Sequence, residues 1–122
     1  MKIAIPVDGK DLESSVGVAF GRSPYFLIYD TETKEENLVV NSASESTGGA
    51  GIKAAQIIVD HKANALLTPR LGGNAAEVLK TAKVDIHKTI AGSVKDNIDA
   101  FMAGKLPLLD EIHEGRHGKT DR

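Results

Sequence analysis

The sequence predicts an α/β fold in which a mixed sheet of five strands is covered by three helices. Two observations support this prediction. The first 40 residues contain three apolar runs of strand length, and from residue 50 onward apolar positions recur at helical spacing in three segments separated by short apolar runs. The element order is therefore β-β-β-α-β-α-β-α. A length of 122 residues suits one domain with its own core.

The first half of the chain supplies three strands. The run 2–7 is almost continuously apolar, which is typical of a buried strand, and Pro6 is expected near its end because proline donates no ladder hydrogen bond. The run 25–29 predicts a second strand. The short polar segment 30–34 then predicts a hairpin turn into a third strand over 36–40.

The second half alternates helices with short strands. Apolar spacing predicts helices that begin near residues 51, 75 and 94. Strands over 65–67 and 84–87 precede the second and the third of these helices. Right-handed crossovers make the later strands parallel to one another, so the sheet is expected to be mixed.

The last predicted helix has recognisable ends. Ser93 is a candidate N-cap, with Asp96 as an imperfect capping box, and Gly104 is expected to follow the helix. The residues after Lys105 lack apolar periodicity and are rich in glycine, histidine and charge. We therefore expect a single cofactor-binding domain over 1–106 and a flexible C-terminal tail over 107–122.

Three glycine-rich turns are expected near the edge at which such sheets bind ligands. The turns 70–74 and 91–93 directly follow predicted strands, and ligands lie beyond the carboxyl ends of parallel strands. The Ser/Gly-rich loop 46–52 lies at this edge only if the third strand also runs parallel, or if the loop crosses over. This loop leads into a helix, whose unpaired N–H groups and dipole favour an anion.

The composition argues against several classes of function. The net charge is −2 and no basic stripe is present, which argues against capture of nucleic acid. No apolar run approaches the roughly 20 residues of a membrane span, and the acidic Asp8 comes too early for a signal peptide. The chain has no cysteine, which excludes disulfides and thiolate-bound zinc or iron–sulfur centres. We expect a cytoplasmic protein with neither membrane nor nucleic acid as a partner.

Three basic residues are candidates for an anion site. Arg22 and Arg70 flank predicted glycine turns, and a guanidinium offers a fork of donors to oxyanions and other diffuse anions. Lys53 adds a positive charge one turn inside the first predicted helix. For each arginine taken alone, a role in surface solubility is the alternative.

Two motif matches lack the context that their chemistry requires. The G-x-G-x-x-A match at 49–54 does not directly follow a first strand and has no acidic residue about 20 positions on, so we interpret it as a general anion-binding loop. The H-E-x-x-H match at 113–117 contains Gly115 and leaves no room for a third ligand downstream. We interpret it as accidental, with adventitious metal binding as the alternative.

The remaining histidines and one acidic cluster receive structural interpretations. His61 ends a predicted helix, where the dipole favours a cation, and His87 stands alone on a short strand. Asp8, Asp11 and Glu13 lie together in the first loop. A solvated loop is expected there, and binding of a hard cation is the alternative.

Four segments occur in an order that is seen in one family: 19–26 (AFGRSPYF), 49–52 (GAGI), 71–79 (LGGNAAEVL) and 91–94 (AGSV). In these segments the chain resembles the dinitrogenase iron–molybdenum cofactor biosynthesis family, up to about residue 106. The resemblance implies a ribonuclease-H-like fold. It also implies a small cytoplasmic protein that binds, stores or escorts metal–sulfur clusters without turnover, together with proteins that donate or accept the cluster.

One position departs from the family pattern. Many members have histidine before Phe-Gly-Arg as a candidate cluster ligand, whereas this chain has Ala19, which places direct ligation from this loop in question. The cysteine-free sequence also resembles the orange protein branch, which holds a molybdenum–copper sulfide cluster without covalent protein–metal bonds. The expected cofactor is therefore a non-covalently bound, molybdenum-containing metal–sulfur cluster, either molybdenum–copper sulfide or an iron–molybdenum precursor.

The expected cluster-binding residues supply N–H donors, positive charge and an apolar wall, which suit a sulfide-rich anion. No catalytic residue and no metal-ligating residue is expected. The predicted set is Phe20, Gly21, Arg22, Gly48, Gly49, Gly51, Lys53, Arg70, Leu71, Gly72, Gly73, Asn74 and Ser93.

Two other functions remain open at this point. A regulatory or adaptor domain would act through protein contacts, with glycine loops that are only structural. A nuclease, suggested by the ribonuclease-H-like fold, would need several carboxylates that converge on a divalent metal, and beyond Asp8 the strands offer only Asp85.

Overall fold

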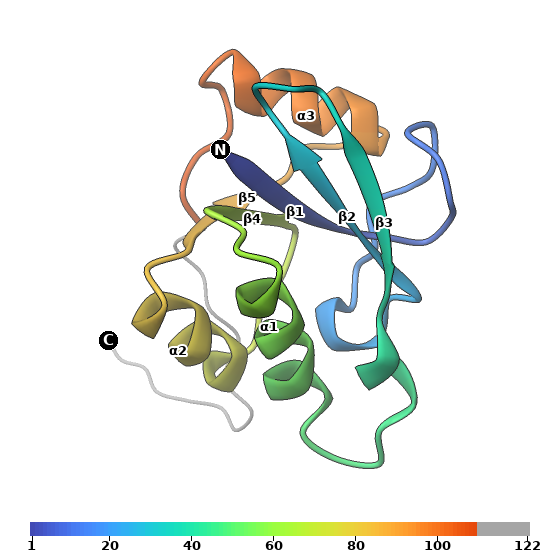
Figure 1. Ribbon diagram of the computed structural model, residues 1–122, viewed down its shortest axis with the longest axis vertical. Coiled ribbons are helices and arrows are strands. Elements are labelled where there is room, and N and C mark those ends of the chain that lie inside the picture. The colour runs from blue at the N-terminus through green and yellow to red at the C-terminus, as the bar shows by residue number, and fades with distance from the viewer. Residues whose placement is uncertain (110–122) are drawn as a thin grey trace.

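A five-stranded mixed sheet separates two layers of helices (Figure 1). The computed structural model describes residues 1–109. The strand order is β3-β2-β1-β4-β5, with β2 antiparallel to both β1 and β3, and β4 parallel to both β1 and β5. The strands are β1 (Lys2–Val7), β2 (Tyr25–Asp30), β3 (Glu36–Val40), β4 (Ala65–Thr68) and β5 (Asp85–Lys88). The predicted α/β class, element order and mixed sheet are confirmed.

The direction of β3 decides where the long loop after it lies. Two antiparallel pairings separate β3 from β1, so these two strands run in the same direction. Val7 and Val40, which end β1 and β3, both pair with Tyr25. The carboxyl ends of β1, β3, β4 and β5 therefore meet at one edge of the sheet, and the loop after β3 begins there.

The helices divide between the two faces of the sheet. Figure 1 shows α1 and α2 together on one side of the sheet and α3 on the other side. Side chains along β1 point alternately to the two faces of the sheet, so Ala4 packs with α1 and α2 whereas Ile3 and Ile5 pack with α3. The helices are α1 (Ala50–Asp60), α2 (Gly73–Thr81) and α3 (Val94–Met102), and the short 3-10 helices are η1 (Phe20–Arg22) and η2 (Ser42–Glu45).

The ends of α3 follow the sequence prediction. The Ser93 hydroxyl accepts a hydrogen bond from the Asp96 amide at 3.1 Å, and the Asp96 carboxylate accepts one from the Ser93 amide at 3.0 Å. The capping box is thus complete rather than imperfect. Gly104, just beyond the helix, has a φ of +73°, a left-handed conformation that glycine adopts without steric penalty.

The packed domain extends beyond the predicted boundary at residue 106. The Lys88 amide donates to the Pro107 carbonyl and the Leu109 amide donates to the Ile86 carbonyl, both at 2.9 Å. Leu109 is buried against the core layer of α1 and α2. Residues 107–109 therefore lie along β5, whereas the sequence led us to expect a flexible tail from residue 107 onward. The remainder, with the H-E-x-x-H match at 113–117, lies outside the described residues.

No helix within residues 1–109 has the length and the hydrophobicity required to cross a membrane.

Candidate functional site

Three segments that are far apart in the sequence line one open depression at the carboxyl edge of the sheet. It has a volume of about 560 Å³. Residues 18–22 form one wall, residues 49–52 at the start of α1 form the second, and residues 70–75 at the start of α2 form the third. We call this site the edge depression.

The first two walls touch through their backbones. A Cβ atom built on Gly21 would lie 3.0 Å from the amide nitrogen of Gly51 and 3.1 Å from the carbonyl carbon of Ala50. No side chain larger than hydrogen fits there without a shift of the backbone. Gly51 in turn lies close to α2, because a Cβ atom on it would be 3.7 Å from the Cβ atom of Ala75.

The first turns of α1 and α2 both face the edge depression. In α1, the Lys53 amide is the first to find a helical acceptor, the Gly49 carbonyl at 3.0 Å, and in α2 the Ala76 amide bonds to the Gly72 carbonyl at 3.0 Å. Within residues 1–109, the amides of 50–52 and 73–75 have no hydrogen-bond acceptor. Two sets of N–H groups, each at the positive end of a helix dipole, therefore line the same cavity.

Arg22 has a structural role in addition to its charge. Its Nη1 donates to the carbonyl oxygens of Ser44 at 2.9 Å and Ser46 at 2.7 Å. Arg22, which belongs to η1, therefore holds the loop that contains η2 in place. The guanidinium has further N–H donors, since an arginine carries five. Arg70 lies across the depression, and its side chain has no bonding partner among residues 1–109.

The two residues expected to form an apolar wall, Phe20 and Leu71, are both buried. Phe20 packs against Phe26 with ring centroids 5.2 Å apart, and Leu71 is almost fully buried. Both residues line the edge depression from the core side. The apolar surface that remains exposed at the rim comes from Val18 and Ile52, which the sequence analysis did not select.

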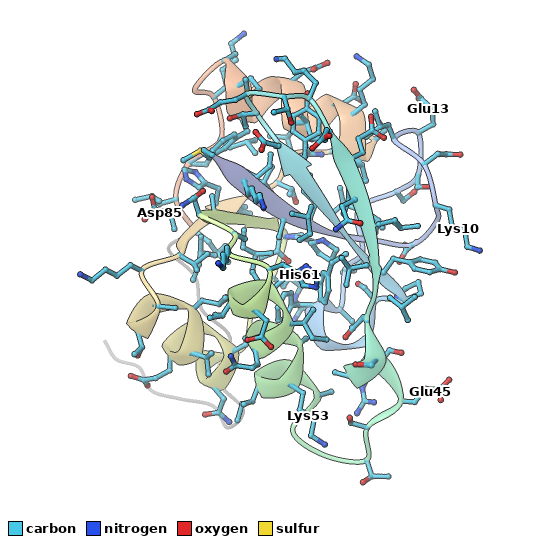
Figure 2. The ribbon with its side chains drawn as sticks, in the orientation of Figure 1. Lys10, Glu13, Glu45, Lys53, His61 and Asp85 are labelled. Carbon is cyan, nitrogen blue, oxygen red and sulfur yellow. The ribbon has the colours of Figure 1, made fainter. Side chains whose placement is uncertain are left out.

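Ten of the thirteen predicted site residues line the edge depression: Phe20, Gly21, Arg22, Gly49, Gly51, Arg70, Leu71, Gly72, Gly73 and Asn74. Gly48 and Lys53 are not among the lining residues. The Lys53 side chain donates to the Ser46 hydroxyl at 3.4 Å, on the part of α1 that faces η2. Figure 2 shows it extending from α1 away from the sheet, with His61 at the opposite end of the helix.

Ser93 lies at the start of α3, on the other face of the sheet, and it does not line the edge depression. The N-terminus of α3 is already occupied by the protein itself. The amides of Val94 and Lys95 donate to the carbonyls of Ser14 and Leu12, at 3.0 and 2.9 Å. With the capping box filled as well, the first turn of α3 has no donors left for an anion.

The lining of the edge depression contains no carboxylate, no imidazole and no thiol among the described residues. Nor does any group of three or more His, Cys, Asp or Glu side chains within residues 1–109 lie together as a metal site. The Asp11 carboxylate accepts hydrogen bonds from the Glu13 amide and the Ser14 hydroxyl, as in a solvated loop. His87 bonds to the Leu106 carbonyl at 3.0 Å and packs edge-on against Phe101.

Five residues of the lining, and one residue behind it, lie outside the set that the sequence predicts. The alanines and aliphatic residues carry no chemical signal that would single them out. Asn41 lies behind η1, almost completely buried, with three side-chain hydrogen bonds. The five lining residues are Val18, Ala19, Ala50, Ile52 and Ala75.

Comparisons with known proteins agree with this architecture. A sequence model for the family described as dinitrogenase iron-molybdenum cofactor matches residues 1–104. An uncharacterized protein of Methanocaldococcus jannaschii is 31% identical over 113 residues, which are 90% of this chain and 92% of the relative.

Two solved structures are similar over most of their length. The apo form of the orange protein from Desulfovibrio gigas has a TM-score of 0.85 and 29% identity, covering 89% of this chain and 92% of that one. A Thermotoga protein described as a candidate NifB protein has a TM-score of 0.81 and 38% identity, covering 96% of this chain and 98% of its own.

Proposed function

Because this chain belongs to the dinitrogenase iron–molybdenum cofactor family, we propose that it binds and carries an anionic, molybdenum-containing metal–sulfur cluster in the edge depression. The cluster is cargo, which the protein stores or escorts without turnover. It passes between donor and acceptor proteins, and either a molybdenum–copper sulfide or an iron–molybdenum precursor suits the site.

One observation carries the proposal: among residues 1–109, the lining combines two helix N-termini and two arginines with no acidic side chain. Such a site attracts negative charge through N–H donors, helix dipoles and guanidinium groups together. The absence of thiol and imidazole from the described lining means that these residues offer no strong ligand for a metal ion. The residues therefore fit an intact anion whose metal already has its own sulfide ligands.

The openness of the site also suits cargo. Val18 and Ile52, which line the depression, are exposed, and the depression is open to solvent. Sulfide bound to metal in a cluster is polarizable and carries diffuse charge, so it tolerates apolar contact better than an oxyanion with localised charge does. An open site lets a partner protein reach the cluster.

The test is uptake by the purified protein of tetrathiomolybdate together with copper(I), followed by gel filtration and measurement of bound molybdenum and copper. We expect both metals and visible absorbance to elute with the protein. Arg70→Ala should weaken binding about tenfold or more, since a charge-assisted hydrogen bond is lost. Lys80→Ala is the matched control, because Lys80 lies in the last turn of the same helix.

Two results would overturn the proposal. One is the absence of uptake by the wild-type protein. The other is unchanged uptake by the double variant Arg22→Ala with Arg70→Ala, which would show that the anion binds elsewhere.

A further inference from the structure

Two asparagine side chains are buried in this domain, and each makes three hydrogen bonds to backbone groups. Asn41 is 1% exposed and Asn97 is 0% exposed. Buried amides persist when all of their donors and acceptors are paired, because an unpaired polar group in the interior is costly. The two residues are thus chemically equivalent, but they stabilise different parts of the molecule.

Asn41 joins η1 to η2. Its Nδ2 donates to the carbonyl oxygens of Gly21 at 3.2 Å and Ser23 at 2.8 Å. Its Oδ1 accepts from the Ala43 amide at 3.1 Å. The two carbonyls require donors and the Ala43 N–H requires an acceptor. A side-chain amide supplies both, whereas a carboxylate or an aliphatic side chain does not.

The Gly21 carbonyl that Asn41 holds belongs to the wall of the edge depression. The same glycine packs on the first turn of α1. A Cβ atom built on Gly21 would lie 3.0 Å from the Gly51 nitrogen. Asn41 itself is not among the lining residues. Its hydrogen bonds therefore hold Gly21, which packs on α1, from behind the wall.

Arg22 depends on the same arrangement. Its Nη1 bonds to the carbonyls of Ser44 and Ser46, which follow directly on the turn that Asn41 begins. If η2 moved relative to η1, the guanidinium would lose these two acceptors. The hydrogen bonds of Asn41 thus support both the Gly21 wall and the contacts that hold the Arg22 side chain.

We propose that Asn41 is a positioning residue for the anion site, which it serves without touching the cargo. This inference rests on the proposed function for the identity of the ligand, whereas its structural content can be measured in the free protein. The role is specific to Asn41, because Asn97 holds a different loop. Asn97 accepts from the Ile90 amide at 2.7 Å and donates to the carbonyls of Ile90 and Ser93 at 3.1 and 3.0 Å.

The experiment compares Asn41→Ala with Asn97→Ala in the full chain by two readouts. The first is the dissociation constant for tetrathiomolybdate with copper(I), measured by equilibrium dialysis. The second is amide hydrogen exchange in the free protein, at Arg22 and Ser23 relative to the amides of β1, because both amides bond to the Ala19 carbonyl within η1. Should either alanine variant fail to fold, Asn41→Ser and Asn97→Ser replace the pair.

We expect Asn41→Ala to weaken binding about tenfold or more and to accelerate exchange at Arg22 and Ser23 by a similar factor, while Asn97→Ala leaves both unchanged. Equal effects of the two substitutions, or wild-type binding by Asn41→Ala, would overturn the positioning role. If the wild-type protein takes up no cluster, the proposed function fails. The exchange comparison alone then decides whether Asn41 fixes the wall.

Discussion

Gly21 and Gly51 meet backbone to backbone, so closely that a methyl group on Gly21 would lie 3.0 Å from the Gly51 amide nitrogen. This contact joins η1 to the first turn of α1 and sets the width of the edge depression between them. It depends on glycine at position 21 much more than at position 51, where a methyl group would make an ordinary contact with Ala75.

Gly21→Ala should therefore destabilise the protein by about 1–3 kcal/mol, because the clash involves backbone atoms that cannot rotate away. Binding of the anion should weaken with it, since the wall moves. Gly51→Ala is the control, and it should be neutral or stabilise the helix by up to about 1 kcal/mol. Urea denaturation of both variants measures the difference, and equal stability of the two would contradict the contact.

Gly49→Ala should cost about 1 kcal/mol of stability. Gly49 precedes α1 with a φ of +68°, a left-handed conformation that strains any residue with a Cβ atom. Gly48 has no atom within 4 Å of a built Cβ and no such φ, so Gly48→Ala should leave the stability unchanged or slightly raised. Thermal unfolding of the two variants under one set of conditions separates the outcomes.

Ser93→Ala should lower stability by about 1 kcal/mol through loss of the N-cap, and it should leave anion uptake unchanged. Ser93→Thr, which keeps the capping hydroxyl, should recover most of the stability. The two measurements are urea denaturation and equilibrium dialysis. If Ser93→Ala lost uptake but kept full stability, Ser93 would belong to the binding site after all.

Leu109→Ala should destabilise the domain by about 2 kcal/mol or more, because Leu109 is 8% exposed and packs in the core of α1 and α2. Leu108→Ala should have little effect, since Leu108 is 58% exposed. Similar denaturation midpoints for the two variants would show that the chain beyond residue 106 contributes nothing to the fold.

Asp30 gives the protein one pH-dependent contribution to stability. Hydrogen bonds from the amides of Glu32 and Thr33 stabilise its carboxylate and hold the pKa of Asp30 below its ordinary value near 3.8. Because the pKa is lowered on folding, the contribution is present at neutral pH and is lost as the pH falls through the folded-state pKa. The stability difference between the wild type and Asp30→Ala should therefore shrink in acid, and NMR titration of the carboxyl group measures the pKa directly.

The sequence predicted the elements well because each has a local signal. Apolar runs mark the strands, and helical spacing together with Ser93 and Gly104 marks α3. The gathering of the turns after β4 and β5 at the carboxyl edge also followed, because parallel strands end together whatever their order. The long loop after β3 could be placed only once β3 was known to run parallel to β1.

Other features of the structure have no local signal in the sequence. Which face of the sheet a helix covers depends on the path of its crossovers, so the sequence did not separate the start of α3 from those of α1 and α2. The Lys53 side chain faces η2 and Ser46. The path of the loop after β3 sets the position of these residues, and the spacing within α1 does not reveal it. Asn41 bonds to residues about 20 positions earlier in the chain, and Pro107 and Leu109 bond to β5. Such long-range contacts cannot be predicted from hydrophobic periodicity.

The central place of β1 has a consequence for synthesis of the chain. β1 precedes its partners β2 and β4 in the chain, so the antiparallel strands β1, β2 and β3 can pair while the chain is still growing. The other side of β1 pairs with β4, where Ile3 meets Ala65. Until that segment leaves the ribosome, one edge of β1 has nothing to pair with, and the residues that later line the cavity are not yet assembled.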